Sequence, residues 1–407
     1  MTPHKTTSKI AAAVRIALLS SSPWLVAHAA GALPIPCAGG SCGHGVTNFV
    51  TAGAASAATT SSALTINQTT QSATLNWQSF NIAAGNTVQF VQPNASAVAL
   101  NMIWDSNPTQ IFGALDANGH VFLINQNGIV FGAGAQVNVG GLVASTLNIA
   151  PTAVTNGLAY PGSQGNAAFQ PFTDSNGNPL PSGNITVQQG AALQAADGGQ
   201  IYMFGTNVTN LGTIQTPEGQ TILAAGTDVY LEESPVSNTN LRGMYVEVQG
   251  SGMVTNGLAS NSSASSPQQL VGQIIAQDGN ISLAALAVNQ YGRLNATTSV
   301  TENGSIYLEA QNGAIQSAGD LPTAEAGGTL VLGQNSDTEV TLDTTDPTET
   351  TVPQPKSTIQ MSGATVQMLQ GSAARATSGV IDVTTAQNLA NTTLSDDGSR
   401  FYMAPGA

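Results

Sequence analysis

Short apolar runs cut by turn-forming dipeptides are the feature of this sequence that most restricts its fold. Between Asn107 and Ile149, Asn-Gly, Asn-Pro or Gly-Gly pairs separate these runs about every six to ten residues. Glycine recurs too often, and the apolar spacing is not three or four, so a long amphipathic helix is excluded. The segment therefore predicts a succession of short strands joined by turns.

Composition favours one elongated β structure over several compact domains. Only 7% of the 407 residues are charged, and 44 are glycine. Such a chain has few Lys and Glu residues for solvated helix faces, so small polar and amide side chains must cover its surface. Because 41% of the residues are hydrophobic, the chain is too apolar to stay unfolded.

The N-terminus predicts an export signal over residues 1–29. Lys5 and Lys9 provide a basic start, residues 10–26 are mostly apolar, and Ala27-His28-Ala29 has the form of a cleavage site. A membrane-spanning helix is the alternative, but it needs about 20 uninterrupted apolar residues. Arg15 and the polar residues that follow interrupt this run.

The charge balance argues against a nucleic-acid partner. The whole chain has a formal charge of −14, whereas a protein that binds phosphates needs a basic surface. Cleavage after residue 29 removes three basic residues and leaves 5 basic against 22 acidic residues, a net charge of −17.

The two cysteines, Cys37 and Cys42, follow the expected cleavage site closely. In an oxidising compartment they can close a small disulfide loop. A metal site that includes His44 is the alternative. Structural zinc usually takes four ligands, and only His120 remains elsewhere after cleavage, so we expect a disulfide and no metal.

Six motifs in order carry a family resemblance. They lie between residues 75 and 146 and include Leu75-Asn76-Trp77-Gln78-Ser79-Phe80-Asn81-Ile82, Val88-Gln89-Phe90-Val91-Gln92-Pro93, Ala99-Leu100-Asn101, residues 107–113, Ala117-Asn118-Gly119 with residues 121–132, and residues 137–146. This region resembles the N-terminal secretion domain of the filamentous haemagglutinin family, the large exoproteins of bacterial two-partner secretion.

The resemblance implies an all-β fold, a right-handed parallel β-helix (a β-solenoid) with an N-terminal cap and β-hairpin excursions. It also implies export through the general pathway into the periplasm of a Gram-negative bacterium. There a dedicated outer-membrane β-barrel transporter recognises the domain through periplasmic domains, and the product becomes secreted or displayed on the cell surface.

Two asparagine-containing turns are associated with secretion in that family. They correspond here to Asn107-Pro108 and to Asn125-Gln126-Asn127-Gly128-Ile129. Gln126 departs from the family pattern, which has proline, so the rigidity that a fixed φ would give is in question. Asparagine and glycine are also ordinary turn residues. Turn formation and partner recognition are therefore both open, and they are compatible.

The rest of the chain predicts further coils. Residues 150–183 interrupt the strands and predict an excursion with a short hairpin around residues 168–173. Blocks that begin at Gly279, Gly304 and Gly328 lie 25 and 24 residues apart. This period indicates a β-solenoid of a dozen or more coils, about 60 Å or longer.

We expect the signal peptide at 1–29, the secretion domain at 30–320, and further coils at 321–407. An acidic linker rich in threonine and proline, within residues 337–355, interrupts the last region.

The sequence predicts neither an enzyme nor a cofactor. Asp197, Glu218, Asp278 and Glu302 recur just before glycines, where carboxylates cap turns, and no basic residues accompany them. His120 is expected to be an exposed corner residue.

We therefore expect an adhesin or haemagglutinin with a host-cell or glycan receptor. The alternatives are a β-helical enzyme acting on polysaccharides and a carrier for a contact-dependent toxin or a haem scavenger. Three or more carboxylates on one open face would favour the enzyme.

Overall fold

The fold is that of a computed structural model. It describes residues 32–43, 45–151, 153, 158, 167–233, 243–259, 267, 270–299, 303–311, 313–315, 323–325, 327–343, 356–385 and 399–407. The expected signal peptide, His44 and residues 344–355 of the expected linker lie outside these ranges. Within them, no helix is both long enough and apolar enough to cross a membrane.

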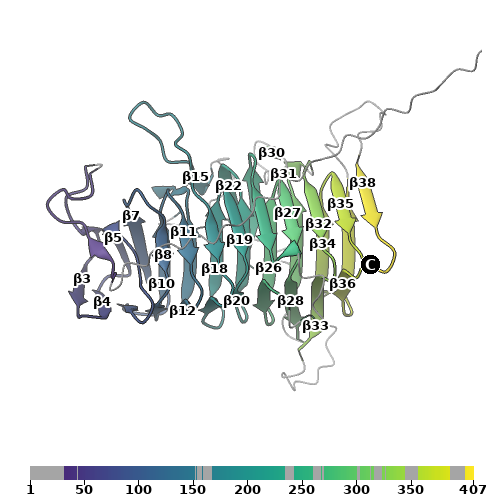
Figure 1. Ribbon diagram of the computed structural model, residues 1–407, viewed down its shortest axis with the longest axis horizontal. Helices are drawn as coiled ribbons and strands as arrows, with labels where there is room; N and C mark the ends of the chain where they lie inside the picture. The colour runs from purple at the N-terminus through teal and green to yellow at the C-terminus, as the bar shows by residue number, and fades with distance from the viewer. Residues whose placement is uncertain are drawn as a thin grey trace, which may run out of the picture.

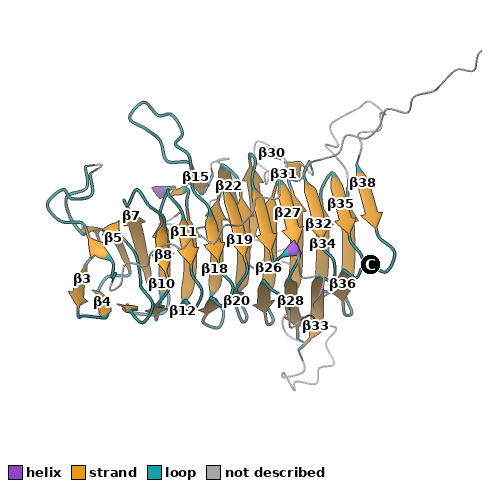
Figure 2. Cartoon of the chain, in the orientation of Figure 1, coloured by secondary structure: helices purple, strands orange, loops and turns teal. Residues whose placement is uncertain are grey.

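The chain winds into a parallel β-helix with three faces, drawn lengthwise in Figure 1 and by strand and loop in Figure 2. Each coil passes through face 1, then face 2, then face 3. This arrangement confirms the predicted fold class.

Face 1 contains β1 (Ile35–Pro36), β2 (Val50–Ala52), β5 (Ser72–Ser79), β7 (Val98–Ile103), β10 (His120–Ile124), β13 (Gly141–Ser145), β18 (Gln200–Gly205), β21 (Gln220–Ala225), β26 (Asn280–Ala285), β29 (Ser305–Ala310), β34 (Thr358–Ser362) and β37 (Val380–Thr384). Face 2 contains β8 (Thr109–Ile111), β11 (Ile129–Phe131), β16 (Ile185–Val187), β19 (Asn207–Asn210), β24 (Met253–Asn256), β27 (Ala287–Gln290), β32 (Thr329–Leu332), β35 (Thr365–Met368) and β38 (Arg400–Met403).

Face 3 contains β3 (Ala55–Thr59), β4 (Ala63–Gln68), β6 (Thr87–Val91), β9 (Ala114–Ala117), β12 (Gln136–Val139), β17 (Ala192–Ala195), β20 (Thr213–Gln215), β25 (Gln273–Ala276), β28 (Arg293–Thr298), β33 (Asp337–Leu342) and β36 (Ala373–Ala376). Two smaller sheets lie outside the helix. They consist of β14 (Asn148–Ile149), β15 (Phe169–Gln170), β22 (Asp228–Glu233) and β23 (Met244–Gln249), and of β30 (Gly313–Ile315) and β31 (Thr323–Glu325).

The core lies inside the helix, where each coil stacks aliphatic side chains on the next. On face 3, strand β12 alternates exposed and buried residues. Its Val137 belongs to an in-register column that continues through Leu193, Ile214, Ile274 and Leu294, all essentially buried. Alternation places one side chain inside and the next outside, so the period-two pattern of the sequence determines which residues form the core.

Antiparallel strands cap the N-terminal end, as the resemblance implied. Strands β1 and β2 pair with β5, and β3 pairs with β4. In this cap Cys37 and Cys42 are joined by a disulfide, with their Cα atoms 5.6 Å apart. Trp77 packs edge-on against Phe49 and Phe80, which closes the end of the core.

The predicted repeat is correct in length but partly wrong in register. Neighbouring face 1 strands are offset by 20 residues between Gln200 and Gln220 and by 25 between Asn280 and Ser305. The third block, however, belongs to face 2, where Thr329 pairs with Ala287. An excursion after β29 separates the face 1 partners Ile306 and Ile359 by 53 residues. The 24-residue spacing to Gly328 therefore combines two different faces.

The described part of the helix is also shorter than expected. Ten strands of face 1, from β5 to β37, run parallel. Nine steps of about 4.8 Å give a stack of about 43 Å. The sequence predicted a dozen or more coils, but the excursions that contain β14, β15, β22, β23, β30 and β31 take up residues that would otherwise form coils.

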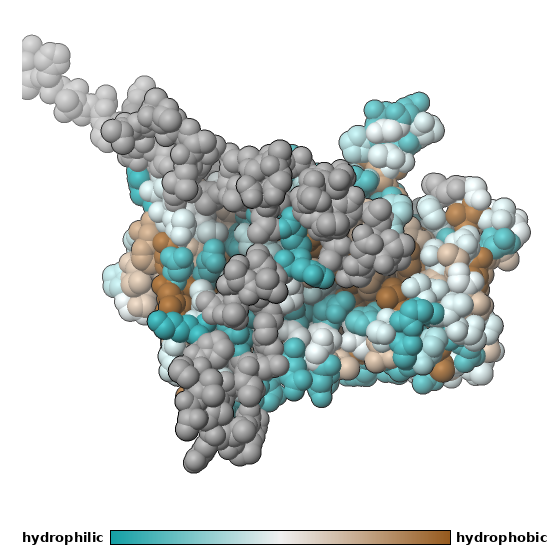
Figure 3. Space-filling view, turned by 180° about the vertical axis from the view of Figure 1, so that it is seen from behind, coloured by the Kyte–Doolittle hydropathy of each residue, from teal (hydrophilic) through white to brown (hydrophobic). Residues whose placement is uncertain are grey.

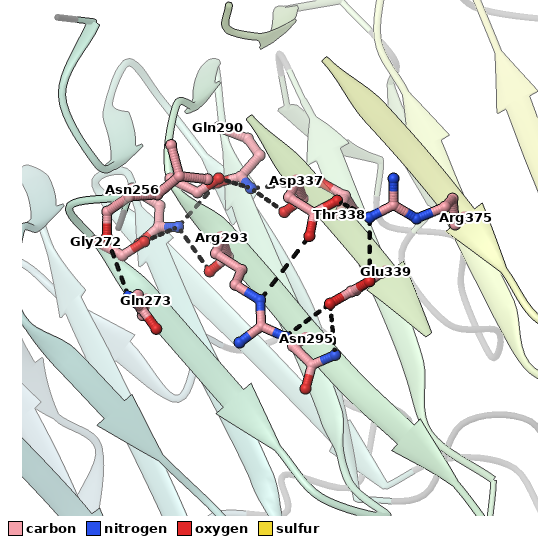
Figure 4. A network of polar contacts seen from close by, with 12 residues as sticks. Asn256, Gly272, Gln273, Gln290, Arg293, Asn295, Asp337, Thr338, Glu339 and Arg375 are labelled. Atoms are coloured by element: carbon pink, nitrogen blue, oxygen red, sulfur yellow. Dashed lines mark hydrogen bonds and ion pairs between the residues drawn. The ribbon is translucent and has the colours of Figure 1, made fainter. Parts of the chain in front are cut away.

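Side-chain amides add to the backbone ladder where the chain turns from face 2 to face 3. Asn210 donates to Asn256 Oδ1, and Asn256 donates to Gln290 Oε1, each over 2.8 Å. Beside this column, Arg293 and Arg375 form ion pairs with Asp337 and Glu339 across β28, β33 and β36 (Figure 4). Buried polar groups need partners, and the stacked amides satisfy one another coil after coil.

The four-stranded outer sheet covers part of face 1 and encloses a second apolar cluster. Phe169, Val229 and Val246 from this sheet belong to a cluster with Phe122 and Phe204 of face 1. As a result, strand β21 is buried along its whole length. The sequence did not predict the β22–β23 hairpin.

Two glutamates are buried beneath this outer sheet. Glu247 of β23 and Glu309 of β29 are 2% and 4% exposed, and Gln311 donates to Glu309 Oε2 over 2.6 Å. Burial raises the pKa of Glu309 to about 7. The charge of Glu309 is the largest cause that raises the pKa of Tyr245, followed by burial and by Glu247. An ionised Glu309 is therefore unfavourable at this position.

Glu309 makes stability dependent on pH. From pH 4.5, the ordinary pKa of the carboxyl, to about 7, the folded protein keeps a proton that the unfolded chain loses. Rising pH therefore destabilises the fold, by up to about 3 kcal/mol above this range. We expect Glu309→Gln to remove this slope, measured as urea unfolding midpoints from about pH 4 to 8.

The matched control is Glu233→Gln, which removes an exposed carboxyl from β22 and should keep the slope of the original protein. Equal slopes for Glu309→Gln and the original protein would show that folding does not raise the pKa of Glu309.

Candidate functional site

The two asparagine-containing turns predicted from the sequence meet at one corner of the helix, between faces 1 and 2. Asn107-Pro108 joins β7 to β8, and residues 125–128 join β10 to β11 in the next coil. Strands β8 and β11 pair directly, with Thr109 opposite Ile129. Asn107 and Asn125 are 18 residues apart in sequence and are joined by a hydrogen bond. The two turns are stacked because one coil has nearly that length.

Asn125 joins the two turns from inside the corner. Its fully buried side chain donates to the Asn107 carbonyl at 3.1 Å and to Thr109 Oγ1 at 3.0 Å. Its own Oδ1 accepts from the Asn127 amide at 2.9 Å. These three bonds use both ends of the amide, so Asn125 is a structural residue of the corner.

The exposed side of the corner belongs to Asn107, Pro108 and Asn127. The Asn107 amide and side chain both donate to Asp105 Oδ1, and Asn127 Nδ2 donates to the Asp105 carbonyl at 2.8 Å. Asp105 thus holds both turns from outside, and the three exposed residues form one continuous surface.

Gly128 allows the two turns to approach closely. Its φ is +121°, and a Cβ atom at this position would lie 3.1 Å from the Asn184 carbonyl oxygen and 3.3 Å from Pro108 Cβ. The next residue, Ile129, is fully buried in the core. A side chain at position 128 would therefore strain the backbone and crowd Pro108.

Gln126, which the family resemblance places where proline is usual, makes a contact that proline cannot make. Its Nε2 donates to the Pro181 carbonyl at 3.0 Å, and its carbonyl accepts from the Gly183 amide at 2.7 Å. Pro181 ends a loop, residues 171–182, that we call the arm; the arm projects from the helix near β15 in Figure 1. Gln126 thus fastens the arm to the corner.

The arm is the last part of the excursion that the sequence predicted over residues 150–183, and its internal structure differs from the prediction. The predicted hairpin around residues 168–173 is wrong, because Phe169 pairs with β14 and β22 instead. The turn lies further along, where Thr173 bridges to Pro179. Asp174 accepts from the amides of Asn176 and Asn178, each at 2.8 Å.

His120 is not the exposed corner residue that the sequence predicted. Its ring is half-buried, its Nδ1 is buried without a hydrogen-bond partner, and burial lowers the pKa of the imidazole. The ring packs where a side chain at Gly141 would stand. His120 therefore contributes to packing at the start of β10.

The acidic residues expected in turns are in turns where the structure describes them. Glu218 and Asp278 have positive φ values, 54° and 48°, and Asp197 precedes Gly198, also with positive φ. Glu302 lies outside the described residues. The acidic groups Glu247 and Glu309 are instead buried under the outer sheet, and Asp337 and Glu339 are paired with arginines. None of these clusters matches the open carboxylate-lined face that would favour an enzyme.

Comparison with known proteins gives one family and several relatives. A family model described as the TPS secretion domain matches residues 46–323. A heme/hemopexin-binding protein of Haemophilus influenzae strain Rd is 33% identical over 180 residues, which cover 44% of this chain and 18% of that protein. A second protein of that description from Haemophilus influenzae is 44% identical over 91 residues, 22% of this chain and 10% of its own length. The chain thus spans less than a fifth of either relative.

A solved structure shares the fold. The crystal structure of the HMW1 secretion domain from Haemophilus influenzae superimposes with a TM-score of 0.58 at 22% identity, covering 87% of this chain and 80% of that one. At this level of identity the likeness supports the β-helix alone.

The Gln126 contact predicts how the arm is held. Gln126→Ala removes the bond to Pro181 but keeps the backbone of the corner, so we expect faster amide hydrogen exchange in residues 171–182 and global stability within about 1 kcal/mol. Gln194→Ala, which removes an exposed glutamine from face 3, is the control. Unchanged exchange in the arm would show that other contacts hold it.

Proposed function

Because the chain belongs to the family of TPS secretion domains, we propose that the corner built from Asn107-Pro108 and residues 125–129 is recognised by its outer-membrane transporter. Family membership places the protein in two-partner secretion, in which an exoprotein crosses the periplasm and leaves through a dedicated outer-membrane partner. The corner proposal assigns the contact between the two to particular residues.

One observation carries the proposal. The two turns form a single surface, in which the residue that holds the turns together is buried and the residues that a partner can contact are exposed. Asn125 is buried and satisfied by Asn107, Thr109 and Asn127. Asn107, Pro108 and Asn127 are exposed and held in place from below. A transporter domain can therefore contact a rigid surface that exists only in the folded coil.

We also propose a non-enzymatic role outside the cell, that of an adhesin. The outer side of face 3 supports it. There Gln89, Asp116, Asn138, Gln194 and Gln215 form an in-register polar column with a single charge. Amides at regular spacing can donate to and accept from sugar hydroxyls, so this face is suited to a glycan receptor.

Haem acquisition is the second candidate, and it is favoured by the description of both relatives as heme/hemopexin-binding proteins. Those proteins are much longer than the matched regions, so their activity need not reside in the part that this chain resembles.

Exposed and buried asparagines predict different secretion defects. The double change Asn107→Ala and Asn127→Ala should lower the amount of protein in the medium at least tenfold, about 1.4 kcal/mol of lost recognition. The unfolding midpoint should change little, because the lost bonds are exposed. Asn125→Ala should instead destabilise the fold by about 2 kcal/mol, because it leaves buried groups without partners.

The amount of the protein is measured in the medium and in the periplasm of cells with and without the transporter. The control is Asn138→Ala with Asn207→Ala, whose amides each make an exposed bond on face 3 or face 2. Normal secretion of the Asn107/Asn127 variant would refute recognition at the corner.

The two extracellular roles are separated by direct binding. We expect the purified chain to agglutinate erythrocytes or bind immobilised neutral glycans, and Asn138→Glu with Gln194→Glu to weaken that binding several-fold. Stoichiometric binding of haemin, detected by its absorption spectrum, together with no glycan binding, would favour the haem role.

A further inference from the structure

A cleft of about 500 Å³ lies beside the corner, between the helix and the arm. Its volume is in the range of ligand pockets. One wall is the turn that follows β7, the floor is the corner, and the other wall is the arm. The lining includes Trp104, Asp105, Gln126, Phe172, Asp174 and Leu180.

The walls of the cleft are held in place by hydrogen bonds. On the helix side, Trp104 Nε1 donates to Asn76 Oδ1 at 3.0 Å, which fixes the indole. On the arm side, the Leu180 amide donates to the Phe172 carbonyl at 2.7 Å. Gln126 fastens the base of the arm to the floor. The cleft therefore exists before any partner binds, which lowers the entropic cost of binding.

The lining combines aromatic surface with negative charge. Trp104 and Phe172 supply rings, while Asp105 and Asp174 supply one carboxylate from each wall. No lysine, arginine or histidine is among the described residues that line the cleft. Hydrogen bonds from Asn178 and then Asn176 lower the pKa of Asp174, so this carboxylate is ionised at neutral pH. Figure 3 shows that the surface of the arm is mostly hydrophilic or neutral in colour.

This combination matches a basic side chain. The aliphatic stem of lysine or arginine packs against apolar and aromatic surface, and its cationic end is attracted to ring faces and carboxylates. The formal charge of the chain, −14, would also steer a basic surface toward it. A neutral segment would leave both carboxylates without compensation.

We propose that this cleft binds a lysine- or arginine-bearing segment of the transporter's periplasmic region. The inference rests on the proposed recognition at the corner and adds the chemistry of the partner. Because the arm is an excursion, its residues can change without altering the coils. The cleft can thus set which transporter a given exoprotein matches, while the corner provides the common contact.

The test is a titration of the full chain with the purified periplasmic region of its own transporter. Asp105→Asn with Asp174→Asn keeps the size and the accepting Oδ1 atoms but removes both charges. We expect the Kd to rise about tenfold at about 0.05 M salt and the difference to shrink to about twofold at about 0.5 M salt, where charges are screened. Asp105→Asn alone should raise the Kd about threefold. This result does not depend on the fold of the arm, because Asp105 lies outside the arm.

The charge-matched control is Asp116→Asn with Asp228→Asn, on β9 and β22 outside the cleft, which should bind like the original chain. Unchanged binding by the cleft variants would overturn the cleft proposal and leave recognition at the corner standing. An equal loss in the control would also overturn it, because only overall charge would then matter. No binding by the original chain would defeat both proposals.

Discussion

The backbone hydrogen bonding between successive coils is the interaction on which the whole structure depends. A coil of about 20 residues has no partner within itself, so its strands pair only with the coils before and after it. At the corners, side-chain amides add hydrogen bonds between coils to those of the backbone. Asn210, Asn256 and Gln290 do this between faces 2 and 3, and Asn125 does it between faces 1 and 2.

This constraint explains why structure and recognition share the same asparagines. A corner amide that bonds to the neighbouring coil fixes the positions of the exposed residues around it. Asn125 holds the Asn107 turn from below, and Asp105 holds it from outside. The surface offered by Asn107, Pro108 and Asn127 is therefore rigid and absent from an unfolded chain. A transporter that binds this surface would distinguish folded coils from an unfolded chain.

The sequence predicted best those features that depend on neighbouring residues, which are the strands and the turns. Alternation and turn residues predicted the short strands between Asn107 and Ile149, where β8 to β14 lie. The prediction failed where an excursion lies between two coils, because spacing alone does not distinguish one face from another. The Gly328 block was therefore assigned to the wrong face. The cleft was also beyond its reach, since Trp104 and Phe172 are far apart in sequence and neither belongs to a motif.

The sequence by itself determined a succession of short strands, because short apolar runs between Asn and Gly turns permit no long helix. Its resemblance to a known family then implied the capped β-helix. Only the tertiary structure decided how the coils align and what the turns do. Stacking placed Asn125 inside and Asn127 outside the same corner. It also gave Gln126 its partner, Pro181, 55 residues away. Such contacts depend on the lengths of the intervening coils and excursions. A local sequence pattern does not show which distant residues those lengths bring together.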